Sequence, residues 1–208
     1  MNVKNIVKQL LTRIFSENVI VFKRREKDRI FLTFDDGPNP EFTPKILDIL
    51  KAHCIKAEFY LIGTQVQRHP DIVRRIIAEG HVIGSHSFSH KGFGRMGWAN
   101  QKEEIVRGAQ AVKPFAPEQE LLFRPPQGRL NLKQILFCRE RKIKIMMWTV
   151  DSMDYDRTKN KDAILERLKN IRFNGGEIIL FHDDNHVTVD ALGDCIHWIK
   201  SKNLKFAV

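Results

Sequence analysis

The 208-residue chain has few of the features that mark several large protein classes. It has three cysteines, Cys54, Cys138 and Cys195, which are too few and too scattered for a disulfide framework. Each lies in an apolar or helical stretch, so we expect buried free thiols in a reducing compartment. No stretch approaches the ~18 consecutive apolar residues of a membrane-spanning helix. Glycine-rich nucleotide-binding motifs, zinc fingers and RNA-recognition motifs are also absent, and we therefore expect no nucleic-acid partner.

Positive charge is plentiful and unevenly placed. The net charge is +10, and the first thirty residues carry eight basic and three acidic side chains. This asymmetry predicts an anionic partner near the N-terminus, and nucleic acid, a membrane surface or an acidic glycan would fit the charge. The composition, 42% hydrophobic and 29% charged, is typical of one globular domain.

The N-terminal segment has the pattern of an amphipathic helix. Its apolar residues recur at helical spacing and form one stripe: Val3, Ile6, Val7, Leu10, Leu11, Ile14 and Phe15. We assign residues 1–28 to a basic amphipathic helix and linker that precede a domain at 29–208. The helix either lies on a membrane surface, through residues 1–17, or packs on the domain. A secretory signal would need a continuous apolar centre and a small-residue cleavage site. We therefore expect a cytoplasmic protein, with peripheral contact to the inner membrane as the alternative.

From residue 29 onward, short apolar runs alternate with helical patterns. The predicted strands are Ile30–Phe34, Ala57–Ile62, His81–Ser85, Leu121–Phe123, Ile143–Val150, Glu177–Phe181 and Leu204–Val208. The predicted helices are Thr43–His53, Pro70–Glu79, Asn100–Lys113, Asn131–Arg141, Asp162–Ile171 and Val189–Lys200. This alternation predicts a parallel sheet covered by helices. Seven strands fit a closed or nearly closed barrel, and a doubly wound open sheet is the alternative.

Ionisable side chains follow five of the predicted strands. They are Asp35 and Asp36, His86 and His90, Arg124, Asp151 and Asp154, and His182 and Asp183. In a parallel barrel, the C-terminal ends of all strands share one face, and that face carries the active site. The sequence therefore predicts that these carboxylates, imidazoles and one guanidinium gather at one rim.

His86 and His90 are candidates for metal binding. They are four residues apart, so one helical turn would bring both rings to the same side. A carboxylate from Asp35 or Asp36 would complete a set of two histidines and one acid, which suits catalytic zinc or non-haem iron. The adjacent carboxylates of Asp35 and Asp36 can have different roles, because one can bind a metal while the other accepts a proton from metal-bound water.

Five segments, in this order along the chain, carry a family resemblance: TFDDGP at 33–38, HSFSH at 86–90, RPPQG at 124–128, DSMDY at 151–155 and LFHD at 180–183. Together they resemble the motifs of the polysaccharide deacetylases of carbohydrate esterase family four. The resemblance extends from about Arg29 to Val208. It implies a single-domain α/β protein, a distorted (β/α)7 TIM-like barrel, and a metal-dependent enzyme that removes N-acetyl groups from sugars.

The resemblance also implies a role for each matching residue. Asp35 is the catalytic base, oriented by Arg124, and His182 is the general acid. Asp36, His86 and His90 are the metal ligands, and the backbone N–H of Gln127 faces the oxyanion. We expect Asp154 to keep His182 charged. Zinc is the expected metal, with cobalt, nickel and ferrous iron as alternatives.

Two positions depart from the family pattern, and both concern substrate contacts. Gln127 stands where an aromatic residue is common, and Tyr155 replaces a tryptophan. In the glycine-rich loop KGFGRMGW, Phe93 and Trp98 are candidates for a sugar-stacking lip, although a loop anchor is an equal alternative.

The expected substrate is an N-acetylated sugar in a surface-glycan or glycolipid precursor. The positive charge suits a phosphate-bearing lipid-linked or nucleotide-linked form. Two alternatives remain: a related amidohydrolase acting on a non-sugar amide, and a catalytically weak glycan-binding protein on the same fold.

Overall fold

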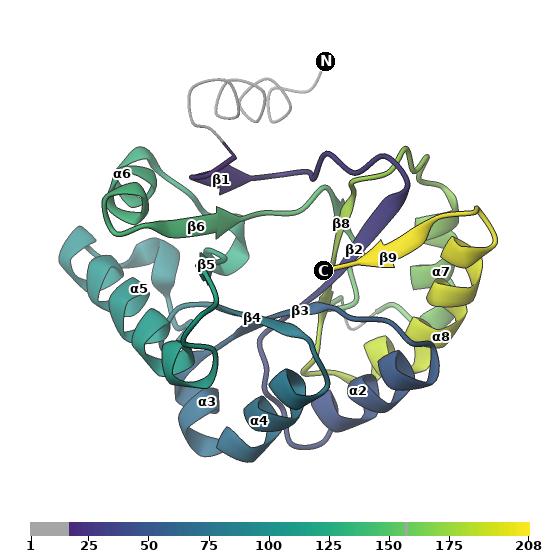
Figure 1. Ribbon diagram of the computed structural model, residues 1–208, viewed down its shortest axis with the longest axis horizontal. Coiled ribbons are helices and arrows are strands. Elements are labelled where there is room, and N and C mark those ends of the chain that lie inside the picture. The colour runs from purple at the N-terminus through teal and green to yellow at the C-terminus, as the bar shows by residue number, and fades with distance from the viewer. Residues whose placement is uncertain (1–16, 157) are drawn as a thin grey trace.

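Parallel strands curl into an open barrel, with helices on its outer surface (Figure 1). The computed structural model describes residues 17–156 and 158–208, so the apolar stripe Val3–Phe15 of the predicted amphipathic helix lies outside the described chain. The strands are β1 (Ile20–Val21), β2 (Arg29–Asp35), β3 (Glu58–Leu61), β4 (Val82–Ser85), β5 (Leu121–Phe123), β6 (Ile143–Met146), β7 (Val150–Asp151), β8 (Ile178–His182) and β9 (Lys205–Ala207). Their spatial order is β1-β6-β5-β4-β3-β2-β8-β7, and β9 pairs with the start of β2. The barrel interpretation is confirmed over the doubly wound sheet.

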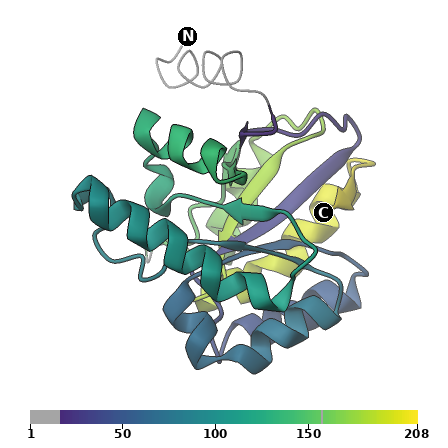
Figure 2. The same cartoon turned by 60° about the vertical axis from the view of Figure 1, so that its left-hand side comes forward.

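The helices cover the outside of the curled sheet (Figure 2). They are α2 (Thr43–Ala52), α3 (Gly63–Arg68), α4 (Pro70–Ala78), α5 (Trp98–Val112), α6 (Leu132–Glu140), α7 (Lys161–Lys169) and α8 (His186–Lys200). Short 3₁₀ turns lie at Phe93–Arg95, Lys113–Phe115 and Pro126–Gly128. Across the described residues, every helix is too short or too polar to cross a bilayer.

From residue 29 onward, all the predicted strands and helices are present, and the differences lie in short elements. The predicted strand Ile143–Val150 is two strands, because β6 ends at Met146 and pairs with β5 while β7 pairs with β8. The helix α3 is only six residues long, and β1 only two, so neither leaves a periodic pattern. Ile20 and Val21 pair with β6, so part of the predicted linker belongs to the barrel.

Strand alternation decides which side chains enter the barrel. Along β2, Phe31, Thr33 and Asp35 point inward, while the side chains between them pack against the surrounding helices. On β5, Leu122 points inward, so Arg124, two residues later, does too. The register thus places the Arg124 guanidinium against the Asp35 carboxylate in the barrel interior.

Asparagine side chains begin the last three helices. Asn131, Asn160 and Asn185 each accept a hydrogen bond from a backbone N–H in the first turn, at 3.0 Å in every case. Such caps satisfy a donor that the helix itself leaves unpaired. At α6, Gln134 bonds back to the Asn131 N–H at 2.9 Å and completes a capping box.

The three cysteines are free thiols, but only two are buried. Cys138 and Cys195 lie in the core, as predicted. The prediction of burial is wrong for Cys54, which is exposed. The helix α2 ends at Ala52, so Cys54 lies in the following turn with φ of 55° and not on the apolar helix face.

Replacing Ile20 with alanine should lower the free energy of unfolding by about 2–5 kcal/mol, because Ile20 is fully buried and the change leaves a cavity. Urea denaturation of the full chain measures this. The control Val208→Ala, at a 42% exposed site, should change it by less than about 0.5 kcal/mol. Equal midpoints for the two variants would show that β1 is not part of the core.

Candidate active site

A cleft of about 370 Å³ opens at the C-terminal ends of the strands. It is lined by Asp35, Asp36, His86, His90, Gln127, Trp148, Asp151, Tyr155, Leu180 and His182. Arg124 and Asp154 are buried and bond to residues of this lining. The structure therefore brings to one rim the side chains that the sequence places after separate strands.

Asp36, His86 and His90 form a group that can hold one metal ion. The Asp36 Oδ1 atom lies 3.6 Å from His86 Nε2 and 3.5 Å from His90 Nε2. Two ligands of one tetrahedral zinc ion, each at about 2.1 Å, lie about 3.4 Å apart. Asp36 Oδ1 is buried and has no hydrogen-bond partner among the described residues. Both the spacing and the unpaired oxygen fit a divalent cation.

The protonation of the two histidines suits this role. His86 Nδ1 lies 2.8 Å from the Arg124 carbonyl, so it donates there and leaves the Nε2 lone pair toward Asp36. Burial lowers the pKa of both His86 and His90, which favours the neutral imidazole that binds a metal. Burial raises the pKa of Asp36, and a bound cation would favour its charged form.

The two histidines do not lie on a helix, so the prediction of a helical turn is wrong. Residues 86–90 form a loop in which Ser87 and His90 have positive φ values of 66° and 63°. Backbone N–H groups of Gly63 and Thr64 hold this loop at 3.0 and 2.8 Å. The loop still brings the two rings together, with centroids 4.9 Å apart.

Glu104, on α5, supports the same loop and was not predicted from the sequence. Its Oε2 accepts hydrogen bonds from the backbone N–H of Phe88 at 3.1 Å and Ser89 at 2.7 Å. Its Oε1 accepts from Ser89 Oγ at 2.9 Å. A buried carboxylate thus satisfies two of the three backbone N–H groups that lie between the two candidate ligands.

Asp35 is held by Arg124, whose side chain is fully buried. Arg124 Nη1 donates to Asp35 Oδ1 and to Thr33 Oγ1, each at 2.8 Å. Its other donors reach the carbonyls of Met146 and Met147 at 3.2 Å. The pair leaves Asp35 Oδ2 directed to the metal group, 3.7 Å from His86 Nε2.

Asp183 fixes the turn that carries the carboxylate pair. It is buried, and its backbone N–H donates to the Asp35 carbonyl at 3.0 Å. Its Oδ2 accepts from Thr43 Oγ1 at 2.5 Å, and burial raises its pKa to about 8. A side chain at Gly37 would collide with this carboxylate, which explains the glycine after Asp36.

His182 and Asp154 form a second pair at the rim. His182 Nδ1 donates to Asp154 Oδ1 at 2.7 Å, which leaves Nε2 for the cleft. Asp154 also accepts from Ser152 and Thr188. Burial alone would lower the pKa of His182, but the hydrogen bond and charge of Asp154, with Asp35 and Asp36, raise it to about 10.

The candidate substrate contacts divide into two groups. Gln127 and Tyr155 line the cleft, and the Tyr155 ring lies 5.4 Å from the His182 ring. Trp148 also lines it and packs against the apolar core behind the cleft. The sugar-stacking prediction is wrong for Phe93, which is 1% exposed and packs near Phe123, as a loop anchor does.

Trp98 also lies away from the cleft lining. It is half-buried at the start of α5, and its ring contacts Phe137 edge-on at 5.7 Å. A sugar bound among the cleft residues would therefore meet Trp148 and Tyr155 in place of Phe93 and Trp98.

Strained backbone is concentrated in the loops of the cleft. Eight described residues other than glycine have positive φ, and five of them lie in these loops: Asp36, Ser87, His90, Gln127 and Met153. Such conformations cost of order 1–3 kcal/mol each and persist where the surroundings enforce them. This concentration is typical of a site whose geometry is fixed for function.

Replacing Glu104 with alanine should weaken Zn²⁺ affinity about 10- to 100-fold, because two buried N–H groups lose their acceptor and the His90 loop loses its support. Glu104→Gln, with one acceptor oxygen, should lose less. Competition with a chromophoric chelator measures this affinity.

The neighbouring Glu103→Ala is the control, because Glu103 is exposed and pairs with Arg107 on the helix surface. Unchanged zinc affinity in Glu104→Ala, or an equal loss in both alanine variants, would reject the role given to Glu104.

Comparison with known proteins agrees with this geometry. A polysaccharide deacetylase family model matches residues 22–142. A peptidoglycan-N-acetylglucosamine deacetylase of Bacillus cereus is 36% identical over 184 residues, which is 86% of this chain and 66%, just under two thirds, of that protein. A chitooligosaccharide deacetylase of Sinorhizobium fredii is 33% identical over 156 residues, covering 74% of this chain and 71% of that protein.

A solved structure shows the same fold. It is the crystal structure of a peptidoglycan N-acetylglucosamine deacetylase in complex with 4-naphthalen-1-yl-N-oxidanyl-benzamide. It matches with a TM-score of 0.84 at 35% identity, covering 91% of this chain and 90% of that one. The chain therefore belongs to the polysaccharide deacetylase family.

Proposed function

We propose that this chain is a metal-dependent N-deacetylase that hydrolyses the acetamido group of a sugar. One observation carries the proposal: the metal group, the Asp35–Arg124 pair and the His182–Asp154 pair meet in a single cleft. A glycan-binding protein would need the cleft but neither the oriented base nor the charged acid.

Asp36, His86 and His90 would hold the cation, and zinc is the metal that their donor atoms favour. Cobalt, nickel and ferrous iron are the alternatives. When bound, the cation supplies Lewis-acid chemistry, polarising a carbonyl and lowering the pKa of water.

Asp35 is the base that takes a proton from the attacking water. Arg124 fixes one carboxylate oxygen at 2.8 Å, and the other is directed to the metal group. Gln127 lines the cleft, with its backbone in the left-handed region at φ of 57°. We assign its N–H to the oxyanion that forms when water adds to the acetyl carbonyl.

His182 is the acid that protonates the leaving amine, because an amine is too basic to depart as an anion. Its Nδ1 is bonded to Asp154, so the proton for transfer is on Nε2. The pKa of His182, raised to about 10, keeps the imidazolium populated at neutral pH. Asp154 also orients the His182 ring by its hydrogen bond, as Arg124 orients the Asp35 carboxylate.

The substrate that we propose is an N-acetylglucosamine unit within a glycan chain. The relatives named above are deacetylases of peptidoglycan and of chitooligosaccharides. Trp148 and Tyr155 give the cleft aromatic walls that can meet the faces of a sugar ring. A lipid-linked or nucleotide-linked precursor, a cytoplasmic location and membrane contact through residues 1–17 stay predictions from the sequence.

A substrate panel separates these possibilities. Acetate release is measured from a chitooligosaccharide, a peptidoglycan strand, lipid-linked and nucleotide-linked acetamido sugars, and a non-sugar acetamide, each with and without chelator. We expect chelator-sensitive release from the sugar chains. Release from the simple acetamide alone would favour the amidohydrolase alternative, and no release from any would favour the binding protein.

Replacing Asp35 with asparagine should keep the metal and lower kcat about 100-fold or more, because the amide cannot accept the proton. Zinc content and acetate release from an N-acetylglucosamine tetramer are measured together. The control Asp184→Asn removes an exposed carboxylate at the same rim and should leave kcat unchanged. Full activity in Asp35→Asn would rule out its role as the base.

Replacing Asp154 with asparagine should move the alkaline limb of the kcat–pH profile to lower pH. Loss of the carboxylate that raises the pKa of His182 lets that group lose its proton earlier as pH rises. The variant should therefore lose more activity at alkaline than at neutral pH. Asp156→Asn, at a half-buried acid close by, is the control. An unchanged limb in Asp154→Asn would contradict the assignment.

A further inference from the structure

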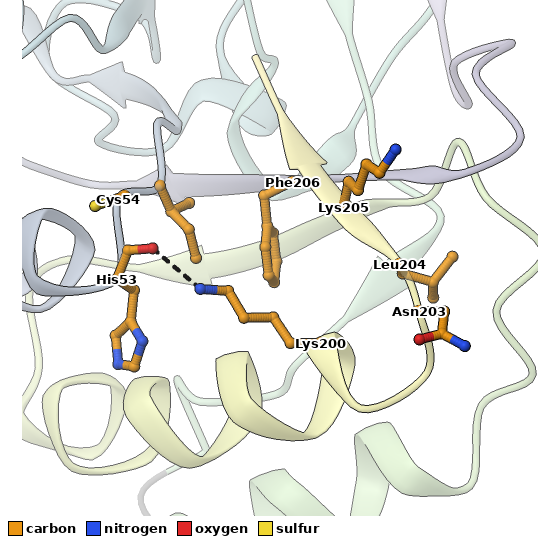
Figure 3. A pocket seen from close by; sticks show the side chains of 8 residues that line it. His53, Cys54, Lys200, Asn203, Leu204, Lys205 and Phe206 are labelled. Atoms are coloured by element: carbon orange, nitrogen blue, oxygen red, sulfur yellow. Dashed lines mark hydrogen bonds between the residues drawn. The ribbon is translucent and has the colours of Figure 1, made fainter.

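Two hollows lie at the end of the barrel opposite the catalytic cleft, and we name them together the basal groove. Their volumes are about 460 and 500 Å³, and both include Leu204 in the turn between α8 and β9. The strand β9 pairs with the first residues of β2, whereas Asp35 ends β2, so the groove and the cleft lie at opposite ends of the strands. Figure 3 shows the first hollow, with Lys200 reaching across it toward His53.

The charged side chains that line the basal groove are all basic: Lys169, Arg172, Lys200, Lys202 and Lys205. Among residues 17–156 and 158–208, acidic groups pair with only two of them, Glu166 with Lys169 at 2.6 Å and Asp28 with Lys205 at 3.7 Å. Lys200 Nζ donates to the His53 carbonyl at 3.0 Å. Arg172 has neither a hydrogen bond nor an ion pair within the described chain. The groove therefore keeps uncompensated positive charge.

Aromatic rings lie among these cations. Trp198 and Phe173 meet in the second hollow, with ring centroids 5.7 Å apart and planes at 62°. Lys202 Nζ lies 5.5 Å from the centre of the Trp198 ring. In the first hollow, Phe206 points down beside Lys200 (Figure 3). Rings that can pack on sugar faces, beside cations that can pair with acids, suit an acidic glycan.

We propose that the basal groove binds an acidic glycan strand, a polysaccharide bearing carboxylate or phosphate groups. The inference rests on the proposed function: the same polymer would present its acetamido groups to the cleft at the other end of the barrel.

A second copy of the chain fits poorly, because its net charge is +10. Residues 1–16 fit no better, since their charged residues are Lys4, Lys8 and Arg13. The aromatic side chains are half-buried in hollows and do not protrude, which disfavours insertion into a bilayer.

Such a site would act by keeping the enzyme on its polymer. Binding through the groove raises the effective concentration of neighbouring acetamido groups at the cleft without changing the chemistry there. A long acidic substrate should gain from it, and a short neutral oligosaccharide should not. The affinity of the groove for the glycan should also fall as the salt concentration rises, because the lysine and arginine side chains that would pair with the glycan are exposed.

The test removes three charges from the groove with Arg172→Gln, Lys200→Gln and Lys202→Gln in one variant. The control carries Arg68→Gln, Arg74→Gln and Arg139→Gln, three exposed cations on other helices. Both should melt within a few degrees of the natural chain. Binding is measured by titration with a soluble polysaccharide of alternating acetamido sugars and uronic acids. Then kcat/KM is measured on an acidic acetamido polymer and on a neutral N-acetylglucosamine tetramer.

We expect the groove variant to lose about tenfold in polymer affinity and in kcat/KM for the polymer, with the tetramer unaffected. The control variant should keep the polymer affinity and the kcat/KM for the polymer. Equal losses in the two variants, or none, would overturn the proposal. So would loss of binding to anionic phospholipid vesicles with glycan binding unchanged. If the natural chain is inactive on the tetramer, the proposed function fails, whereas the titration still decides the groove.

Discussion

The buried guanidinium of Arg124 is the interaction on which the site depends. Its side chain fixes Asp35, and its own backbone carbonyl fixes His86, so one residue orients both the base and a candidate metal ligand. It bonds also to Thr33, Met146 and Met147, and its guanidinium carbon lies 3.9 Å from the centre of the Tyr60 ring. A buried charge is tolerated only when it is paired and hydrogen-bonded in this way. The packing of the barrel interior therefore also fixes the geometry of the candidate active site.

The same rim gives its histidines opposite properties through their surroundings. His86 is buried and His90 half-buried beside a carboxylate oxygen that has no donor of its own among the described residues, and desolvation lowers the pKa of both. His182 is bonded to Asp154, and its pKa rises to about 10. Neutral rings can bind a cation, and a charged ring can give up a proton. One residue type thus serves as ligand at two positions and as acid at a third.

The sequence predicted where the site residues lie better than it predicted the loop conformations and hydrogen bonds that hold them in place. Asp35, His86, Arg124 and His182 each follow an apolar run, and parallel strands bring such positions to one rim. The approach of His86 to His90 could not be predicted as it occurs, because it depends on positive φ at Ser87 and His90. Glu104 gave no signal, since an acid in an amphipathic helix is ordinarily solvated. Phe93 was ambiguous because an aromatic residue in a glycine-rich loop can line a site or anchor the loop.

The cleft and the basal groove would give the protein two contacts with one kind of polymer, one for chemistry and one for retention. The chemistry in the cleft depends on the claim that Asp36, His86 and His90 hold a single divalent cation. The most direct measurement is anomalous diffraction at the zinc edge from crystals grown with Zn²⁺. The account predicts one strong peak within about 2.0–2.2 Å of a carboxylate oxygen of Asp36 and of Nε2 of both histidines. A cleft without such a peak, or a peak that contacts none of the three, would contradict it.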